Sequence, residues 1–597
     1  MLRQRHAAPA VMAAALAFVS LTAVPSTRAV EPEPPSALIT AEEAIGIAVR
    51  QRLATAEPGE TAGDKSDREA LAAFYVARGS EPLWIDASGL TPKARALADE
   101  IARAADWGLD PKAFALPESD LGASPSRDVL AAAEARLSIA ALRYARFARG
   151  GRIPDPRDMS SYLDRDPQLV SPVLVLERLA ETSDPGGYIV SLHPQHEGFQ
   201  RLRRKLIEMR TAAAETKAEQ PVAVPAEGPT LIPGNRHPDV ALLRQRLKVE
   251  QSAGGDAQLY DDALIEAVKA YQGANGMTPD GLVGRRTRAS LNGGAPDRRR
   301  ADEGLLIANM EMWRWMPDDL GATHVMVNLP EYQFRVVKNG GVIHEERLII
   351  GKVENQTPVF SHAMEFVVLH PFWGVPDSIK VREVLPGIAR GNNLSRQGLR
   401  LQYNGRDVDA TQIDWSKADI RQFHVYQPPG PANVLGVVKF MFPNKHQVYM
   451  HDTPTKHLFA TSTRTYSHGC MRVRNPVRLA EVILQEDKGW SAEQVHQLLR
   501  TGPENNNVTL EKNIPVHVVY FTAWVDDSGE LQTRPDVYSH ERRVRLALDG
   551  KWNQIPRHAD HLAPVKLERP LMVQNEIGSG GGGNAVENFF QNLFGGF

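Results

Sequence analysis

The sequence predicts a multidomain protein with a helical N-terminal region, a small three-helix module and a β-rich α+β domain. Three observations lead to this prediction. The chain has 597 residues, which is more than a single hydrophobic core usually serves. Apolar residues recur at three- and four-residue spacing over 40–210 and 233–294, as in amphipathic helices. From about residue 323 they alternate instead, which is typical of strands.

The first two regions are helical and are separated by a linker. In 40–210, KARALADEIARAADWGL and VLAAAEARLSIAALRYARFARG are expected to pack on one another. The helical period is lost over 211–232, a Pro-containing segment that we interpret as a linker. In 233–294, two amphipathic helices precede a turn at Gly281 and Gly284 and a short third helix. These glycines suit positive backbone dihedral angles or a tight turn.

The third domain, 323–545, begins with strands and ends with helices. HVMVNLPEYQFRVVKNGGVIHEERLII alternates and breaks at Asn339-Gly340, a strong hairpin signal. EFVVLHPFWGVP, HQVYMHD and IPVHVVYFTAWV are further strand candidates. Asn475-Pro476 predicts the start of a helix, with Asn as N-cap and Pro at the first helical position.

A long insertion interrupts the strands of this domain. Residues 377–446 are polar, rich in Gly and Pro, and far longer than a usual connection. The insertion is either a lid over an active site or a surface loop. We favour the lid, because the insertion ends just before His451.

Both ends of the chain lie outside these domains. Residues 1–29 have a basic start, an apolar run over 10–24 and small residues up to Ala29. This pattern predicts a secretory signal peptide cleaved near Ala29, with an uncleaved anchor as the alternative. A Pro-rich linker is expected over 30–39 and a flexible Gly-rich tail over 577–597. The net charge of −3 gives no general basic footprint, which argues against nucleic-acid binding.

Cys470 is the only cysteine, so an exported chain cannot use it for an internal disulfide. It lies in RTYSHGCMRVRNP and is either a nucleophile or a small buried side chain. A nucleophilic thiolate needs a nearby base or positive charge. His468 and His451 are both candidate bases, and sequence spacing does not decide between them. A zinc site made of these three residues is disfavoured, because a metal would occupy the nucleophile. We expect neither a metal nor a cofactor.

Several segments resemble cell-wall enzymes. HDTPTKHLFATSTRTYSHGCMRV resembles the L,D-transpeptidase signature of an upstream His, then Ser-His-Gly-Cys, a hydrophobic residue and Arg. QPPGPANVLGVVKFMFPN and VVLHPFWGVPDSI resemble the large periplasmic subgroup of that family, which has a helical N-terminal region, a peptidoglycan-binding module and a lid in the catalytic domain. YDDALIEAVKAYQGANGMTPDGLVGRRTRASL resembles the three-helix peptidoglycan-binding domain, although a spacer without a ligand is the alternative. The resemblance covers roughly residues 40–545.

The resemblance implies the roles of the central residues. Cys470 is the nucleophile and His451 the general base, which takes the thiol proton or holds a thiolate–imidazolium pair. Backbone N–H groups near Gly469 and Cys470 are expected to form the oxyanion hole. Asp452, or its backbone carbonyl, is expected to orient the His451 ring.

Other residues receive weaker assignments. Ser467 and His468 are expected to shape the pocket and donate hydrogen bonds. Arg472 binds a stem carboxylate or forms a structural salt bridge. Tyr449 and Trp373 are pocket walls or core residues.

The implied reaction is peptidoglycan cross-linking. Cys470 would attack the carbonyl between diaminopimelate and D-alanine of a tetrapeptide stem, and the amine of a second stem would then take the acyl group. The expected partners are stem peptides and glycan strands, with other cell-wall synthesis proteins as candidates. Hydrolysis by an L,D-carboxypeptidase and a non-catalytic wall-binding scaffold are the alternatives. The sequence departs from the subgroup at His370, where we expect Asn, and whether this histidine contributes to the site stays open.

Overall fold

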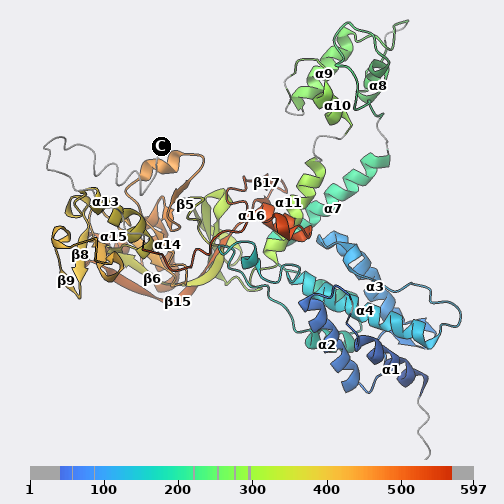
Figure 1. Ribbon diagram of the computed structural model, residues 1–597, viewed down its shortest axis with the longest axis horizontal. Coiled ribbons are helices and arrows are strands. Elements are labelled where there is room, and N and C mark those ends of the chain that lie inside the picture. Colours follow the sequence, from blue (N-terminus) through green and yellow to red (C-terminus); the bar gives the residue numbers. More distant parts are fainter. Residues whose placement is uncertain are drawn as a thin grey trace, which may run out of the picture.

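The computed structural model of the protein describes residues 40–567, except 57, 87, 219–221, 252–253, 275–276, 278 and 293–297. The predicted signal peptide, the linker before residue 40 and the Gly-rich tail lie outside the described residues. Figure 1 shows a helical lobe, a three-helix module and a lobe built on a curved sheet, which meet near helices α7 (Glu197–Ala218) and α11 (Arg298–Trp313). This arrangement confirms the predicted fold class. No helix within the described ranges combines the length and the apolar character needed to cross a membrane.

The N-terminal lobe, which we call the scaffold lobe, consists of amphipathic helices around α4. Its described elements before α7 include six α-helices and one short hairpin: α1 (Ala41–Leu53), α2 (Ala62–Ala77), β1 (Ile85–Asp86), β2 (Gly89–Leu90), α3 (Pro92–Ala102), α4 (Arg127–Ala148), α5 (Pro172–Glu181) and α6 (Pro185–Ser191). Glu134 of α4 is fully buried and accepts hydrogen bonds from Tyr75 Oη and from the amides of Leu83 and Trp84. The carboxylate therefore satisfies three buried donors and attaches the hairpin segment to α4.

Helix α7 differs from the prediction at its end. It continues to Ala218, into the segment 211–232 that we interpreted as a linker. The extension follows from composition, because TAAAETKA consists mostly of strong helix formers.

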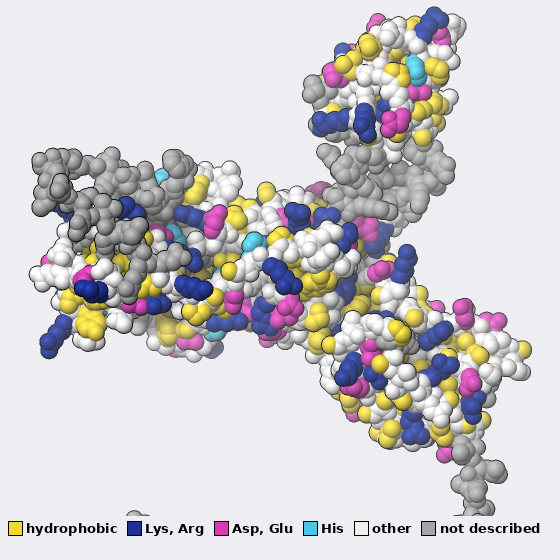
Figure 2. Space-filling model, in the orientation of Figure 1, with side chains coloured by type: hydrophobic (Ala, Val, Ile, Leu, Met, Phe, Trp, Pro, Cys, Tyr) yellow, Lys and Arg dark blue, Asp and Glu magenta, His cyan; other side chains and the backbone are white. Residues whose placement is uncertain are grey.

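The three-helix module has a hydrophobic core of its own, which includes Leu243, Leu264 and Val268. Its helices are α8 (Pro238–Arg246), α9 (Asp262–Ala274) and α10 (Arg285–Leu291). Gln272 fixes the turn before α10: its amide donates to Leu282 O (3.0 Å) and its oxygen accepts from Gly281 N (2.9 Å). Figure 2 shows the module projecting away from the rest of the described surface, with charged and apolar side chains intermixed.

The two glycines of this turn differ. Gly281 has the predicted positive φ, 71°. Gly284 is extended, with φ −85° and ψ −175°, and serves as the N-cap of α10. Only the first glycine therefore needs the conformational freedom that we expected of both.

The third lobe is built on a curved sheet. Within the described residues nine strands pair in the order β13-β5-β14-β12-β11-β6-β15-β3-β4, and β5 also pairs with β4, so the sheet curves round on itself. The strands are β3 (Thr323–Asn328), β4 (Gln333–Lys338), β5 (Gly341–Gly351), β6 (Phe360–Leu369), β11 (Val438–Met441), β12 (Met450–His451), β13 (Thr465–Ser467), β14 (Met471–Val473) and β15 (Asn506–Val519). Lys338 pairs with Gly341 across Asn339-Gly340, where both φ angles are positive, which confirms the predicted hairpin.

Helices and a second hairpin complete this lobe. They are α14 (Pro476–Lys488), α15 (Ala492–Thr501), β16 (Ala523–Val525), β17 (Leu531–Thr533) and α16 (His540–Leu548). Pro476 begins α14 as predicted, and Asn475 is at the N-cap position. Its side chain does not cap the helix, however, because it donates to the Glu346 carboxylate instead.

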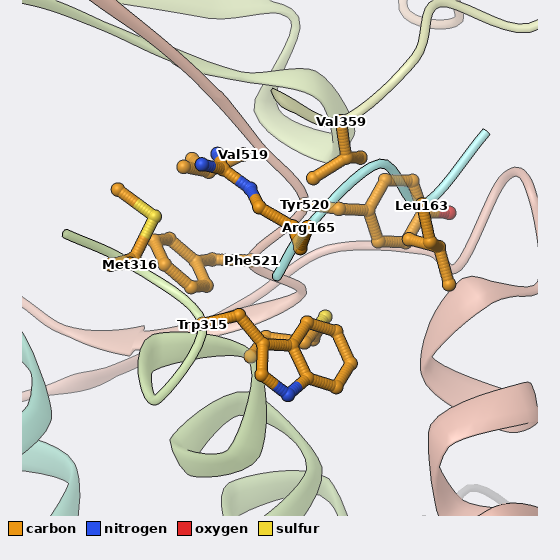
Figure 3. A pocket seen from close by; sticks show the side chains of 9 residues that line it. Leu163, Arg165, Trp315, Met316, Val359, Val519, Tyr520 and Phe521 are labelled. Carbon is orange, nitrogen blue, oxygen red and sulfur yellow. The ribbon is translucent and has the colours of Figure 1, made fainter. Parts of the chain in front are cut away.

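The scaffold lobe and the sheet lobe share one continuous hydrophobic core. At their junction, Arg165 is buried and donates to Ser361 Oγ and to Val518 O, and this burial lowers its pKa to about 9. Figure 3 shows side chains from the scaffold lobe, the end of α11 and β15 around a narrow hollow. The hollow has room for about one water molecule, so the two lobes are closely packed.

The predicted insertion is a folded unit rather than a loop. Its elements are β7 (Trp373–Gly374), α12 (Asp377–Ile379), a π-helix (Lys380–Val384), α13 (Leu385–Ala389), β8 (Arg400–Tyr403), β9 (Arg406–Asp407) and β10 (His424–Gln427). It has its own hydrophobic core, onto which Val565 and Leu567 from the C-terminal segment pack. The predicted boundary at 446 was too late, because β11 belongs to the main sheet. The alternation of Val438, Lys439 and Phe440 marks this strand but is short and follows a Gly- and Pro-rich stretch.

Candidate active site

The candidate site lies on one face of two short neighbouring strands. Strand β12 pairs in parallel with β14, with Met450 opposite Met471 and His451 opposite Arg472. Successive side chains of a strand point to opposite faces, and both methionines are buried in the shared core. His451 and Arg472 therefore face the other side. Tyr449 is on that side as well, with its ring centroid 5.7 Å from that of His451.

Cys470 directly precedes β14 and lies beside Tyr449. The amide of the next residue, Met471, donates to Tyr449 O (3.0 Å), and the Cys470 sulfur interacts with the Tyr449 side chain. As a residue, Cys470 is partly buried. The preceding Gly469 has a φ of 115°, and its carbonyl accepts from Thr357 Oγ1 (2.7 Å), which fixes the loop that presents the cysteine.

Both reactive groups are neutral in the resting site. Burial raises the pKa of the Cys470 thiol above its usual value, against the opposing effects of Tyr449, Lys439 and Arg472. Burial, together with the nearby Arg472 guanidinium, lowers the pKa of His451 to about 3. At neutral pH the site therefore holds a thiol and an uncharged imidazole, rather than a preformed thiolate–imidazolium pair.

The His451 ring is held in one tautomer. Its Nδ1 hydrogen-bonds to the backbone carbonyl of Asp452. A carbonyl oxygen only accepts, so Nδ1 carries the proton and Nε2 has the free lone pair. The Asp452 carboxylate is engaged elsewhere, with Val437 N (3.0 Å), Thr453 N (2.7 Å) and Lys456 Nζ (2.5 Å). Of the two orienting groups that we predicted, the carbonyl contacts the ring.

His468 points toward the insertion. Its Nε2 lies 2.6 Å from Glu383 Oε1, and Glu383 belongs to the π-helix of the insertion. π-Helical turns are rare and often occur at functional sites. This contact joins the loop that carries Cys470 to the insertion and places His468 in a different role from His451.

The amides that we predicted as oxyanion donors are not equivalent. The Gly469 amide already donates to Ser467 Oγ (3.1 Å), and this hydroxyl donates to Cys470 O (2.5 Å). Gly469 would have to give up this bond to bind an oxyanion, and its role stays a prediction. The role of the Cys470 amide stays a prediction.

Three weaker assignments are resolved in part. Trp373 is 4% exposed within the core of the insertion, which corresponds to the core alternative rather than to a pocket wall. Arg472 is 1% exposed and donates to Thr455 Oγ1 (3.3 Å). His370 has a positive φ of 49°, and its backbone bonds to Val437 and Asn505, at the start of the insertion.

Sequence reasoning missed two residues of this site. Lys439 of β11 lies opposite His451, and it was assigned to the insertion. Glu383 is distant in sequence from its partner His468, and no motif marks it. The alternation around Lys439 was the available signal. Within the described ranges, no group of three or more His, Cys, Asp or Glu side chains is arranged to hold a metal ion.

Three family models match separate parts of the chain. A "Scaffold domain" matches residues 69–206, a "Putative peptidoglycan binding domain" matches 236–291, and an "L,D-transpeptidase catalytic domain" matches 322–499. The last match contains both His451 and Cys470. The first two matches fall within the regions that we separated on periodicity, and the third starts one residue before its region.

Known proteins give the same indication. The chain is 28% identical over 302 residues to a protein of Haemophilus influenzae named "Putative L,D-transpeptidase". This match covers 50% of the chain and 59% of the relative, so the chain spans less than two thirds of that protein's length.

Solved structures are more distant. An L,D-transpeptidase from Mycobacterium smegmatis is 13% identical, with 33% of this chain and 58% of that chain covered and a TM-score of 0.16. One from Xylanimonas cellulosilytica is 17% identical, with 49% of this chain and 99% of that chain covered and a TM-score of 0.14. Scores this low carry no argument about the site.

Proposed function

This chain belongs to the L,D-transpeptidase family, and on that premise we propose that it is a peptidoglycan L,D-transpeptidase working in the periplasm. The observation that supports the proposal most directly is the strand register. It supports the proposal because His451, whose Nδ1 carries the proton, shares a face with Arg472, and Arg472 and Tyr449 both act on the Cys470 thiol. An imidazole and a thiol are the two groups that cysteine acyl transfer requires.

Acylation is the first half of the proposed reaction. His451 Nε2 takes the Cys470 proton as sulfur attacks the carbonyl that joins diaminopimelate to D-alanine. The C–N bond then breaks, the imidazolium returns the proton to the departing amine, and a thioester remains. The Cys470 amide is the proposed donor to the oxyanion. A neutral base suits this cycle, because it accepts a proton and then releases it within one turnover.

Transfer to an acceptor is the second half. The side-chain amine of a second stem attacks the thioester, loses a proton to His451 and displaces the sulfur, which recovers its proton. The product is a cross-link between two stems. The module is proposed to hold the enzyme on the wall, since its sequence matches a peptidoglycan-binding model. Water in place of the second amine would hydrolyse the thioester with the same residues, so hydrolysis to a tripeptide stem is the second candidate outcome.

Product analysis tests the proposal. Purified protein would be incubated with disaccharide tetrapeptides that end in D-alanine, and the products identified by mass spectrometry. We expect cross-linked dimers together with released D-alanine, and neither product with Cys470→Ala. Tripeptides without dimers would indicate a carboxypeptidase. Unchanged substrate with the wild-type protein, in the presence of normal binding to wall sacculi, would indicate a non-catalytic scaffold.

A further inference from the structure

Lys439 lies in the same row of side chains as the proposed base. Strand β11 pairs antiparallel with β12, with Lys439 opposite His451, and His451 is opposite Arg472 on β14. Lys439 is partly buried, and its ammonium lies 4.4 Å from the centroid of the Tyr449 ring. Since Tyr449 also contacts Cys470, the ammonium and the sulfur approach the same ring.

Lys439 is unlike its neighbouring lysines in its ion pairs. The two lysines nearest in sequence each pair with an aspartate: Lys445 with Asp164 (2.7 Å) and Lys456 with Asp452 (2.5 Å). Within the described part of the chain, Lys439 forms no ion pair with Asp or Glu, and Cys470, once deprotonated, is a group of opposite charge that acts on it. A partly desolvated ammonium is unfavourable unless a counter-charge is supplied. In this site the cysteine sulfur supplies one when it loses its proton.

We propose that Lys439 is the charge partner of the Cys470 thiolate, and that its ammonium stabilises the sulfur anion at the moment when His451 takes the proton. The inference rests on the proposed function, because it assigns Lys439 a role in a cycle in which Cys470 is the nucleophile. Arg472 acts on the sulfur in the same direction, but it is almost fully buried and donates to Thr455. Lys439 is therefore the less buried of the two cations.

The same charge also affects His451. Lys439 and Arg472 both lower the pKa of the imidazole, so they favour the thiolate and disfavour the imidazolium. The proton taken from sulfur is then held only weakly, which favours its onward transfer to the departing amine. Lys439 thus acts through its charge on Cys470 and His451, and not through direct contact with the substrate.

Alkylation of the cysteine provides a test that needs no peptidoglycan. Because Cys470 is the only thiol, the mass gained with iodoacetamide reports on this sulfur alone. Rates would be measured from pH 6 to 11 for the full-length wild-type protein and for Lys439→Met, Lys439→Gln and Lys439→Arg. Lys445→Met is the matched control, since it removes a lysine that is paired with Asp164.

We expect the midpoint of the pH–rate profile to rise by about one pH unit in Lys439→Met and Lys439→Gln, with alkylation at pH 7 about tenfold slower. Lys439→Arg and Lys445→Met should keep the wild-type midpoint. Two neutral variants are used so that one that fails to fold, as judged by circular dichroism, leaves the other. Coincident profiles for wild type and either folded neutral variant would overturn the inference. A shifted midpoint together with no cross-linking by the wild type would instead retain the charge pair and reject the proposed function.

Discussion

Successive residues of strands β12 and β14 point to opposite faces, and the two faces have different roles. On one face Met450 and Met471 are fully buried in the core shared by the scaffold and sheet lobes. On the other, His451 and Arg472 lie beside Lys439, Tyr449 and the cysteine. The first face contributes buried methionines to the core, whereas the second carries two cations and an imidazole. The comparison indicates that the side chains facing the core hold the two strands in place, and that those on the opposite face are available for the chemistry.

The largest effect on activity is expected from His451→Gln. This change removes the base and leaves a side chain of similar length that cannot take the thiol proton. The rate of acyl transfer should fall by about 10²- to 10⁴-fold. Product formation from tetrapeptide substrate, measured at matched protein concentration, gives the ratio. A loss of less than tenfold would show that the reactive face does not depend on this imidazole.

The largest effect on stability is expected on the opposite face. Met471→Ala should lower the free energy of unfolding by about 2–5 kcal/mol, because it leaves a cavity in the core. Cys470→Ala, one residue earlier and partly exposed, should cost less than about 1 kcal/mol. Urea denaturation followed by circular dichroism compares the two. Equal losses would contradict the division of labour between the faces.

Lowering the pH should decrease the stability of the folded protein through His451 on the reactive face. The pKa of His451 is lowered to about 3, so the unfolded chain binds a proton at this residue below about pH 6.5 while the folded chain does not. The stabilisation is complete above pH 6.5 and is lost as the pH falls, by up to about 1.4 kcal/mol per pH unit. In His451→Gln this component should be absent. The free energies of unfolding of the wild type and of His451→Gln would be measured between pH 6.5 and 5. The wild type should lose more stability as the pH falls, and equal slopes for the two proteins would contradict this prediction.

The smallest effect is expected where the insertion meets the reactive face. Glu383→Gln removes the charge opposite His468, and both side chains are partly exposed, so the stability cost should stay below about 1 kcal/mol. If this contact keeps the insertion close to the cysteine loop, alkylation of Cys470 should become a few-fold faster. Glu354→Gln, at an exposed position, is the control. An unchanged rate would show that the contact does not govern access.

The parts of the candidate site that are encoded locally can be proposed from the sequence. His451 and Cys470 belong to one contiguous signature, and strand alternation then places His451 and Arg472 on one face. The Asp452 carbonyl was a predictable partner because it belongs to the residue adjacent to His451. The state of the Gly469 amide was not predictable, since it depends on the rotamer of Ser467 and on the exact loop conformation.

The residues of the site that sequence analysis did not predict come from other parts of the chain. Glu383 meets His468 only because the insertion folds onto the sheet, and nothing in its own neighbourhood indicates a partner. Lys439 was hidden for another reason, since a four-residue strand follows a Gly- and Pro-rich stretch and was read as part of it. A short alternating run gives too weak a signal to outweigh its surroundings.

The distribution of hydrophobic cores determines which parts of this chain can be exchanged between related proteins. The three-helix module has its own core, so we expect that recombination could replace it without changing the core of the other two lobes. The scaffold lobe has no such independence, because its apolar residues continue into those beneath the sheet. A scaffold lobe from another protein would have to pack against the same apolar surface of the sheet lobe. We therefore expect the scaffold lobe and the sheet lobe to be inherited as one unit.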